Sequence, residues 1–421
     1  MMEGWKEVKI KDLGQVVTGN TPPRKQPELY GKHTLFIKPT DINIGEKYCR
    51  EPEECYSEKG FHKYKKSLIP KNATCVVTIG SIGKKMIKSH TDLFINQAMN
   101  AIIPNENYDE DFIFYLLKLN LFQLKTFDSG TASGRENVSK SSFSNIKISV
   151  PKSKETQRKI ASILSAYDDL IENNLKRIKL LEEKAQQTYE EWFVRFKFPG
   201  YETVAFDEVS GLPVDWEKVK LNEVLKFNQG VQVAIDDQLP DNNNERVRFI
   251  RIVDVTQSGQ EKRFIQRPRE SQIVNRKDLF MVRYGAPQVV TNFEGAIANN
   301  FFKINIINTN QVFAKYVYSF LNRKEIRDYL MGVSVSATMP AISFKSFGQI
   351  KMNLPEKDLQ QKFHKYVDSI FELILNLQNQ NQHLKEARDI LLPRLMSGMI
   401  DVDGLDSGEA LGMVAEENEK Y

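Results

Sequence analysis

The segment GWKEVKIKDLGQVVTG, residues 4–19, returns with substitutions as DWEKVKLNEVLKFNQG at residues 215–230. Two more pairs follow in the same order: LFIKPTDI (35–42) with RFIRIVDV (248–255), and SSFSNIKISVP (141–151) with SFKSFGQIKMNLP (343–355). The halves are offset by roughly 200 residues, too long a period for a solenoid repeat. The pattern predicts the duplication of one globular domain.

Inside each half, short alternating runs such as CVVTI and VRFIRIV are typical of strands. Longer runs such as DFIFYLLKLNLFQL and VFAKYVYSFLNRKEIRDYLM are typical of helices. Strands and helices mix without a regular βαβ rhythm, so we expect the α+β class and no doubly wound sheet.

Each domain is followed by a long helical pattern, at residues 157–193 and 360–397, with apolar residues mostly three and four apart. Such heptad stripes predict coiled-coil helices. Each stripe contains one asparagine, Asn174 and Asn381. A buried asparagine can fix the register of the helices. The equally favoured alternative is that each asparagine lies at the solvent-exposed edge of its stripe.

The order predicts two tandem domains separated by two long antiparallel coiled-coil helices, related by a pseudo-twofold axis. About 36 helical residues span roughly 54 Å. The same length of double-stranded DNA contains about 16 base pairs. We expect residues 1–153 and 199–356 to form the domains, 154–198 and 357–402 the spacer helices, and 403–421 an acidic tail.

The 421 residues carry a net charge of +4 and a pI near 8.6, which permits nucleic-acid binding without requiring it. The 3 cysteines lack CxxC spacing, so neither a disulfide framework nor a metal site is indicated. No apolar run approaches the ~18 residues of a membrane span. We expect a cytoplasmic protein with no membrane partner.

Motifs for catalysis are missing from the sequence. The stretch VVTIGSIGKK (76–85) resembles a phosphate-binding loop, but Thr78 stands where the first glycine is required and Lys85 where the hydroxyl is required. No cofactor fingerprint follows a strand, and TPPR (21–24) is only a fragment of an adenine methyltransferase motif. A stand-alone enzyme is therefore disfavoured.

The chain resembles the specificity (S) subunit of type I restriction-modification systems. The segments that carry the resemblance are EEWFVRFKFPG (190–200), ILLPRLMSGMIDV (390–402), AYDDLIENN (166–174), PKSKETQRKIASIL (151–164), LFIKPTDI, the GSIGKK loop and GTASGRENVSKSSF (130–143). The second domain departs from the pattern at MVRYGAPQVV (281–290), which has a glycine but no Gly-Lys.

The resemblance implies a non-catalytic subunit in which each target-recognition domain reads half of a bipartite, asymmetric DNA site. It implies that the helices set the spacer and dock two methyltransferase (M) subunits, which motor-nuclease (R) subunits join. No cofactor is expected on this chain; S-adenosylmethionine, ATP and Mg belong to the partners. The rival reading is a coiled-coil adaptor with two protein-binding heads.

Candidate contacts combine basic groups for phosphates with amide, hydroxyl and Arg groups for base edges. In the first domain these are Lys38, Thr40, Lys84, Lys85, Ser133, Arg135, Asn137 and Lys140. In the second they are Arg248, Arg251, Tyr284, Gln288, Asn292, Ser336 and Thr338. A solvated surface charge is the alternative for each lysine, an ion pair with Asp254 for Arg251, and a core aromatic for Tyr284.

The helix ends carry the candidate partner contacts. Trp192, Phe193, Leu391 and Leu392 are apolar, and a coiled coil alone would leave them uncovered. We expect these patches to help dock the M subunits.

Overall fold

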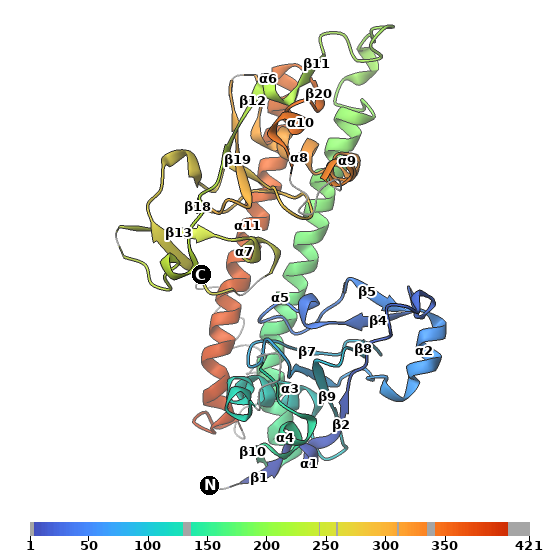
Figure 1. Ribbon diagram of the computed structural model, residues 1–421, viewed down its shortest axis with the longest axis vertical. Coiled ribbons are helices and arrows are strands. Elements are labelled where there is room, and N and C mark those ends of the chain that lie inside the picture. Colours follow the sequence, from blue (N-terminus) through green and yellow to red (C-terminus); the bar gives the residue numbers. More distant parts are fainter. Residues whose placement is uncertain are drawn as a thin grey trace. The chain divides into compact units, whose positions relative to one another are not determined.

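In the computed structural model the chain divides into two compact units (Figure 1). Unit 1 contains residues 1–173 and 380–421, and unit 2 contains residues 174–379. The structure describes residues 4–128, 136–243, 245–257, 260–309, 311–334 and 342–402. Each unit therefore combines one domain with part of each long helix.

The described residues of unit 1 form two four-stranded sheets and one two-stranded sheet. Their strand orders are β2-β9-β6-β7, β3-β5-β4-β8 and β1-β10. The strands are β1 (Trp5–Lys9), β2 (Gly14–Thr18), β3 (Tyr30–Gly31), β4 (Thr34–Ile37), β5 (Glu54–Tyr56), β6 (Thr74–Val77), β7 (Met86–Lys88), β8 (Phe94–Ile95), β9 (Met99–Pro104) and β10 (Lys147–Pro151). The helices are α1 (Ile10–Leu13), α2 (Glu58–Tyr64), α3 (Glu110–Leu119) and α4 (Lys140–Asn145), with 3₁₀ turns η1 (Pro27–Leu29), η2 (Pro39–Asp41), η3 (Lys65–Ser67) and η4 (Leu121–Phe127).

Unit 2 repeats this topology in two of its sheets, whereas in its second four-stranded sheet the parallel pair β13-β18 is central and the matching pair β4-β8 of unit 1 lies at the edge. Its strand orders are β12-β19-β16-β17, β14-β13-β18-β15 and β11-β20. The strands are β11 (Glu217–Lys220), β12 (Leu225–Gln229), β13 (Arg246–Ile250), β14 (Arg263–Gln266), β15 (Ile273–Val274), β16 (Leu279–Val282), β17 (Val289–Val290), β18 (Gly295–Ile297), β19 (Phe301–Ile306) and β20 (Lys351–Leu354). The helices are α6 (Leu221–Val224), α7 (Ile252–Thr256), α8 (Ala314–Leu321), α9 (Lys324–Ser334) and α10 (Phe344–Gly348), with 3₁₀ turns η6 (Tyr201–Thr203), η7 (Ile235–Asp237) and η8 (Glu270–Gln272).

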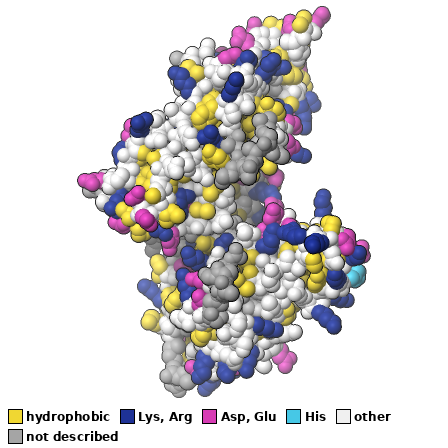
Figure 2. Space-filling view, in the orientation of Figure 1, with side chains coloured by type: hydrophobic (Ala, Val, Ile, Leu, Met, Phe, Trp, Pro, Cys, Tyr) yellow, Lys and Arg dark blue, Asp and Glu magenta, His cyan; other side chains and the backbone are white. Residues whose placement is uncertain are grey.

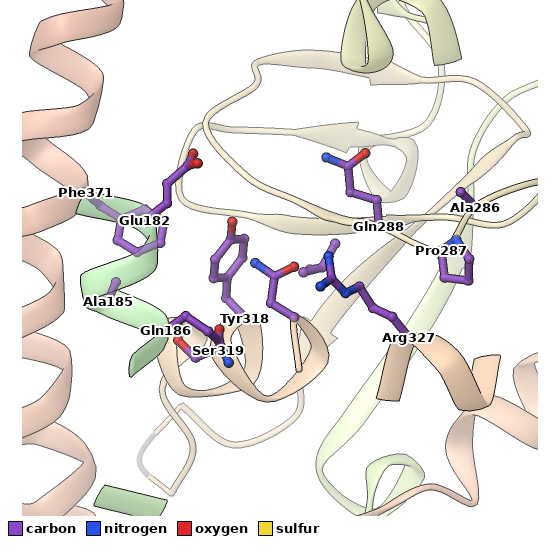
Figure 3. A pocket seen from close by; sticks show the side chains of 12 residues that line it. Glu182, Ala185, Gln186, Ala286, Pro287, Gln288, Tyr318, Ser319, Arg327 and Phe371 are labelled. Atoms are coloured by element: carbon purple, nitrogen blue, oxygen red, sulfur yellow. The ribbon is translucent and has the colours of Figure 1, made fainter. Parts of the chain in front are cut away.

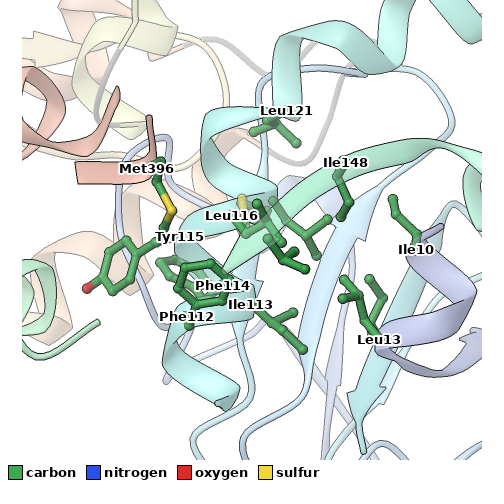
Figure 4. Packing of buried hydrophobic residues seen from close by; sticks show 14 of the residues in the cluster. Ile10, Leu13, Phe112, Ile113, Phe114, Tyr115, Leu116, Leu121, Ile148 and Met396 are labelled. Carbon is green, nitrogen blue, oxygen red and sulfur yellow. The ribbon is translucent and has the colours of Figure 1, made fainter. Parts of the chain in front are cut away.

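The sheet β2-β9-β6-β7 of unit 1 and the sheet β12-β19-β16-β17 of unit 2 are each buried on both faces. In β6, Val76 belongs to the core shared with the helices, whereas Cys75 and Val77 belong to the core between the two four-stranded sheets. Because successive strand residues point to opposite faces, a run such as CVV can fill both cores. Figure 4 shows the helix-side core, in which α3 residues such as Phe112 and Leu116 pack toward Ile148 of β10.

The long helices are α5 (Lys154–Tyr189), continued by one π-helical turn η5 (Glu190–Val194), and α11 (Lys357–Met396). In unit 1 the start of α5, with Ile160 and Leu164, shares a core with Leu395 near the end of α11. In unit 2 the start of α11, with Phe363 and Val367, packs with the α5 part of that unit. Within each unit the two helices thus run antiparallel.

Equivalent glutamines anchor the helix starts. The Gln157 side chain accepts from the Asp109 N–H at 3.0 Å and donates to the Pro151 carbonyl at 3.1 Å. The Gln360 side chain accepts from the Phe313 N–H at 3.3 Å and donates to the Pro355 carbonyl at 2.9 Å. A fully buried glutamine that bonds to a backbone N–H and a backbone carbonyl of its own domain fixes where each helix leaves that domain.

These observations confirm the predicted α+β class, the two tandem domains and the long antiparallel helices. The asparagines of the apolar stripes, Asn174 and Asn381, are both buried, at 7% and 5% exposure. Among the described residues, no helix combines the length and the apolar character needed to cross a membrane.

Candidate nucleic-acid interface

The GSIGKK loop connects β6 to β7 in unit 1. The Val77 N–H donates to the Lys85 carbonyl at 3.1 Å, which closes the hairpin. Gly80 and Gly83 adopt φ values of 87° and 76°, in the left-handed region that favours glycine. Lys84 is exposed and makes no ion pair with the described residues. This is a surface turn that presents one lysine, Lys84, where the sequence predicted two.

The hairpin loop between β16 and β17 holds the equivalent position in unit 2. The Val282 N–H donates to the Gln288 carbonyl at 3.0 Å, and Gly285 has a φ of 93°. This loop is two residues shorter than its counterpart and carries no lysine. Gln288 is exposed, whereas Tyr284 is half-buried with the Arg283 guanidinium 5.3 Å from its ring centre.

A second segment lies against each hairpin loop. In unit 1 the Val138 N–H donates to the Thr78 carbonyl at 2.8 Å, and the Gly80 N–H donates to the Glu136 carbonyl at 3.0 Å. In unit 2 the Ile342 N–H donates to the Arg283 carbonyl at 2.9 Å. The structure therefore brings the segment before α4 or α10 together with the loop in both units.

These paired segments carry several of the candidate contacts. Asn137 is half-buried beside the loop, with its N–H donating to the Asp128 carboxylate at 2.7 Å, and Lys140 is exposed at the start of α4. Ser133, Arg135, Ser336 and Thr338 lie outside the described residues.

Lys85 differs from the expectation of a surface charge. It is only 6% exposed, and its Nζ donates to the Pro39 carbonyl at 2.9 Å, so it ties the loop to η2. Burial lowers the pKa of Lys85, although Asp41 opposes that shift. A buried amine with a carbonyl acceptor is placed to hold the loop rather than to meet a phosphate.

Lys38 and Arg251 occupy equivalent capping positions. The Lys38 N–H donates to Asp41 at 2.7 Å, and its Nζ pairs with Glu53 at 2.6 Å. The Arg251 N–H and Nε donate to Asp254 at 2.8 and 2.9 Å, the pairing that the sequence offered as the alternative. In this conformation both cations are occupied within their own domain.

The remaining candidate DNA contacts are Thr40 in unit 1 and Arg248 and Asn292 in unit 2. Thr40 is exposed on η2. Arg248 lies on β13 with its guanidinium 5.5 Å from the Phe293 ring centre. Asn292 follows β17 with a φ of 65°, and its N–H donates to the Arg276 carbonyl at 3.1 Å. Asn292 therefore has a structural role through its backbone, in addition to its candidate role as a DNA contact.

Unit 2 also contains a cavity of about 410 Å³ beside the hairpin loop (Figure 3). The lining residues come from α5, the β16–β17 loop, α8, α9 and α11, and include Ala185, Gln288, Tyr318, Arg327 and Phe371. Burial raises the pKa of Tyr318 to about 12, so its hydroxyl stays protonated at neutral pH.

The candidate partner contacts are more covered than the sequence suggested. Phe193 is 2% exposed and packs on Tyr316 and Phe363, with ring centres 4.8 and 5.0 Å away. Leu392 is 5% exposed in the unit 1 core. Trp192 and Leu391 are half-buried. Each domain thus covers much of its own helix end, because its core extends onto the helices.

On the face that Figure 2 shows, the charged side chains are spread rather than gathered into one patch. Figure 2 shows Lys and Arg side chains in small groups, with Asp and Glu near many of them.

The sequence reasoning did not single out η4. A Cβ at Gly83 would lie 3.3 Å from the Cγ and Cε atoms of Lys125, so this lysine runs along the GSIGKK loop. The apolar run DFIFYLLKLNLFQL indicated one helix, but α3 ends at Leu119 and a 3₁₀ turn begins at Leu121. Asn120, a poor residue for a helix interior, was the available signal for this break.

Comparisons with known proteins show which sequences this chain is similar to. A family model described as "Type I restriction modification DNA specificity domain" matches residues 2–183 and 213–386. A type I restriction enzyme specificity subunit (MjaIX) of Methanocaldococcus jannaschii is 28% identical over 416 residues, covering 95% of this chain and 94% of its own. The HindI specificity subunit of Haemophilus influenzae is 30% identical over 189 residues, which covers 42% of this chain and 39% of its own.

Solved structures give a weaker likeness. The type I restriction-modification S subunit from M. genitalium aligns with a TM-score of 0.48 at 16% identity, covering 93% of this chain and 96% of its own.

Proposed function

The chain belongs to the type I restriction-modification DNA specificity family, and we propose that each of its two domains reads one half of a split, asymmetric DNA site. Members of this family are specificity subunits without catalysis of their own. The two domains differ in sequence at every candidate contact, so two unlike half-sites are expected.

One observation supports this proposal above the others. In both units the same backbone bond, Val138 to Thr78 and Ile342 to Arg283, joins a hairpin loop to the segment before α4 or α10. Loops held on a rigid scaffold are where binding residues concentrate. A duplicated scaffold that presents two different loop pairs fits two different DNA sequences.

We further propose that α5 and α11 set the spacer between the half-sites and help dock two M subunits, which R subunits join in the full complex. Trp192 and Leu391, both half-buried, are the docking candidates that remain accessible. Phe193 and Leu392 would act indirectly, by holding the helix ends in place.

The decisive experiment is a methylome. The chain is co-expressed with its cognate M subunit in a host without other modification, and methylated bases are mapped by single-molecule sequencing. Two unlike short sequences around a fixed gap are expected. Methylation at a continuous motif, or the same pattern without this chain, would refute the proposal.

Salt dependence separates the proposal from the adaptor alternative. A DNA reader that neutralises several phosphates loses affinity steeply as salt rises. An adaptor with two protein-binding heads would not bind the duplex at any salt concentration.

Variants in one unit test the assignment of half-sites. Replacing Arg135 and Asn137 with Ala is expected to relax the motif at one half and to leave the other half unchanged. The matched variant in unit 2 is Gln288→Ala, which should affect only the other half. Loss of sequence preference at both halves from either change would contradict independent reading.

A further inference from the structure

The turn η4 places an aromatic side chain in the open beside the GSIGKK loop. Phe122 is 65% exposed, although phenylalanine is a residue that folding normally buries. Its neighbours Leu121 and Leu124 are buried at 9% and 4% exposure, so the turn is anchored in the core while Phe122 points away from it.

The geometry of the turn aligns Phe122 with a lysine. A 3₁₀ helix has about 3 residues per turn, so side chains three apart project from the same face. Phe122 and Lys125 therefore share one face of η4, and Lys125 lies against Gly83 of the loop. Lys84 is the next residue of that loop and is exposed.

The cations around Phe122 are available. Among the described residues, Lys84 and Lys125 make no ion pair, and Lys140 on the adjoining helix α4 makes none. An exposed aromatic ring that shares a face with an unpaired ammonium group is complementary to DNA, whose stacked base steps lie beside the phosphates.

We propose that Phe122 is a DNA contact whose ring packs against a base-pair step of the half-site read by the first domain. Lys84 and Lys125 are placed to meet the flanking phosphates. This inference rests on the proposed function and adds an apolar contact to it, at a residue that carries no hydrogen-bonding group.

The test uses the assembled complex of this chain with its M subunit and a duplex carrying the methylated motif. Binding is measured by fluorescence anisotropy over a range of salt concentrations for wild type, Phe122→Ala and Phe122→Leu. Phe122→Ala is expected to weaken binding by about 10-fold and to leave the salt slope unchanged, because no phosphate contact is lost. Phe122→Leu should lie between the two, and it decides the test where the alanine variant folds poorly.

The matched control is Tyr329→Ala, which removes a 49% exposed aromatic from α9, the element that follows α8 in unit 2. It should leave reading of the first half-site unchanged. A duplex with 2-aminopurine in the first half-site adds a second readout: its fluorescence should change on binding to wild type and less with Phe122→Ala.

Two outcomes would overturn the inference. Unchanged affinity and unchanged 2-aminopurine response in Phe122→Ala would remove the ring from the interface. Reduced recovery of the M subunit with Phe122→Ala would identify the surface as a protein contact instead. A wild-type complex without a split motif would instead refute the proposed function.

Discussion

The two units fill equivalent positions of their helices with opposite chemistry. Counted from the equivalent helix-start glutamines, Asp168 and Arg388 of unit 1 correspond to Phe371 and Ala185 of unit 2. In unit 1 the acid and the guanidinium form an ion pair, each at most 2% exposed. In unit 2 the ring and the methyl group line the cavity of about 410 Å³.

The residues around these two positions differ between the units in the same way. In unit 1 the Tyr115 hydroxyl donates to Asp168 at 2.5 Å, and Asp111 pairs with Lys47 and Lys88 at 2.8 Å. In unit 2 the Phe371 ring packs instead on Tyr318, with ring centres 5.1 Å apart. Equivalent helix positions can therefore hold either a buried charge network or an aromatic contact beside a cavity.

The largest effect is expected from Asp168→Ala. Removing one partner of a buried ion pair leaves Arg388 charged in a dry site, which costs about 3–5 kcal/mol of unfolding free energy. Hydrogen exchange measured peptide by peptide should show faster exchange in unit 1 and little change in unit 2. The double variant Asp168→Leu with Arg388→Leu should recover most of the loss, because an apolar pair of similar volume needs no charge partner. An equal loss in the double variant would mean that the pair stabilises by packing.

Acid should loosen unit 1 through Asp111. Burial alone would raise the pKa of this carboxyl, but the ammonium groups of Lys47 and Lys88 outweigh it and hold the pKa below its usual range. The stabilisation is therefore complete above the unfolded pKa of about 4 and is lost as the pH falls through the lower, folded pKa. Thermal melting between neutral pH and pH 3 should show a steeper fall for wild type than for Asp111→Asn. Parallel curves would exclude this carboxyl as a source of acid sensitivity.

How far the sequence predicts each unit depends on the kind of interaction. The repeated segments and the apolar periods sufficed for the α+β domains and the long helices, because burial patterns are local. They did not reveal that Lys85 is buried or that Lys38 is paired, since a lysine's partner depends on tertiary contacts. The same holds for Phe193 and Leu392, whose cover comes from a domain distant in sequence. The alternative for Arg251 was open to sequence because Asp254 is only three residues away.

A smaller effect on stability is expected from filling the cavity of unit 2. Ala185 is 4% exposed and borders the cavity. Ala185→Leu should stabilise unit 2 by about 0.5–1 kcal/mol, in the range of cavity-filling substitutions. In a Trp5→Phe background, which removes the tryptophan of unit 1, chemical denaturation followed by the fluorescence of Trp192 and Trp216 reports on this unit. Destabilisation by Leu would show that the wall around residue 185 cannot accept added volume.

The smallest effects concern the two hairpin loops, where the units differ by one exposed lysine. Lys84→Ala should leave stability unchanged and make the salt slope of DNA binding shallower by about 0.9, because one phosphate contact is lost. The reciprocal change, Ala286→Lys in the shorter loop of unit 2, should steepen the slope by about the same amount. Both slopes come from DNA titrations at several salt concentrations. If Lys84→Ala changed base preference while the slope stayed the same, the lysine would be reading bases, and the loops would differ in sequence recognition as well as in charge.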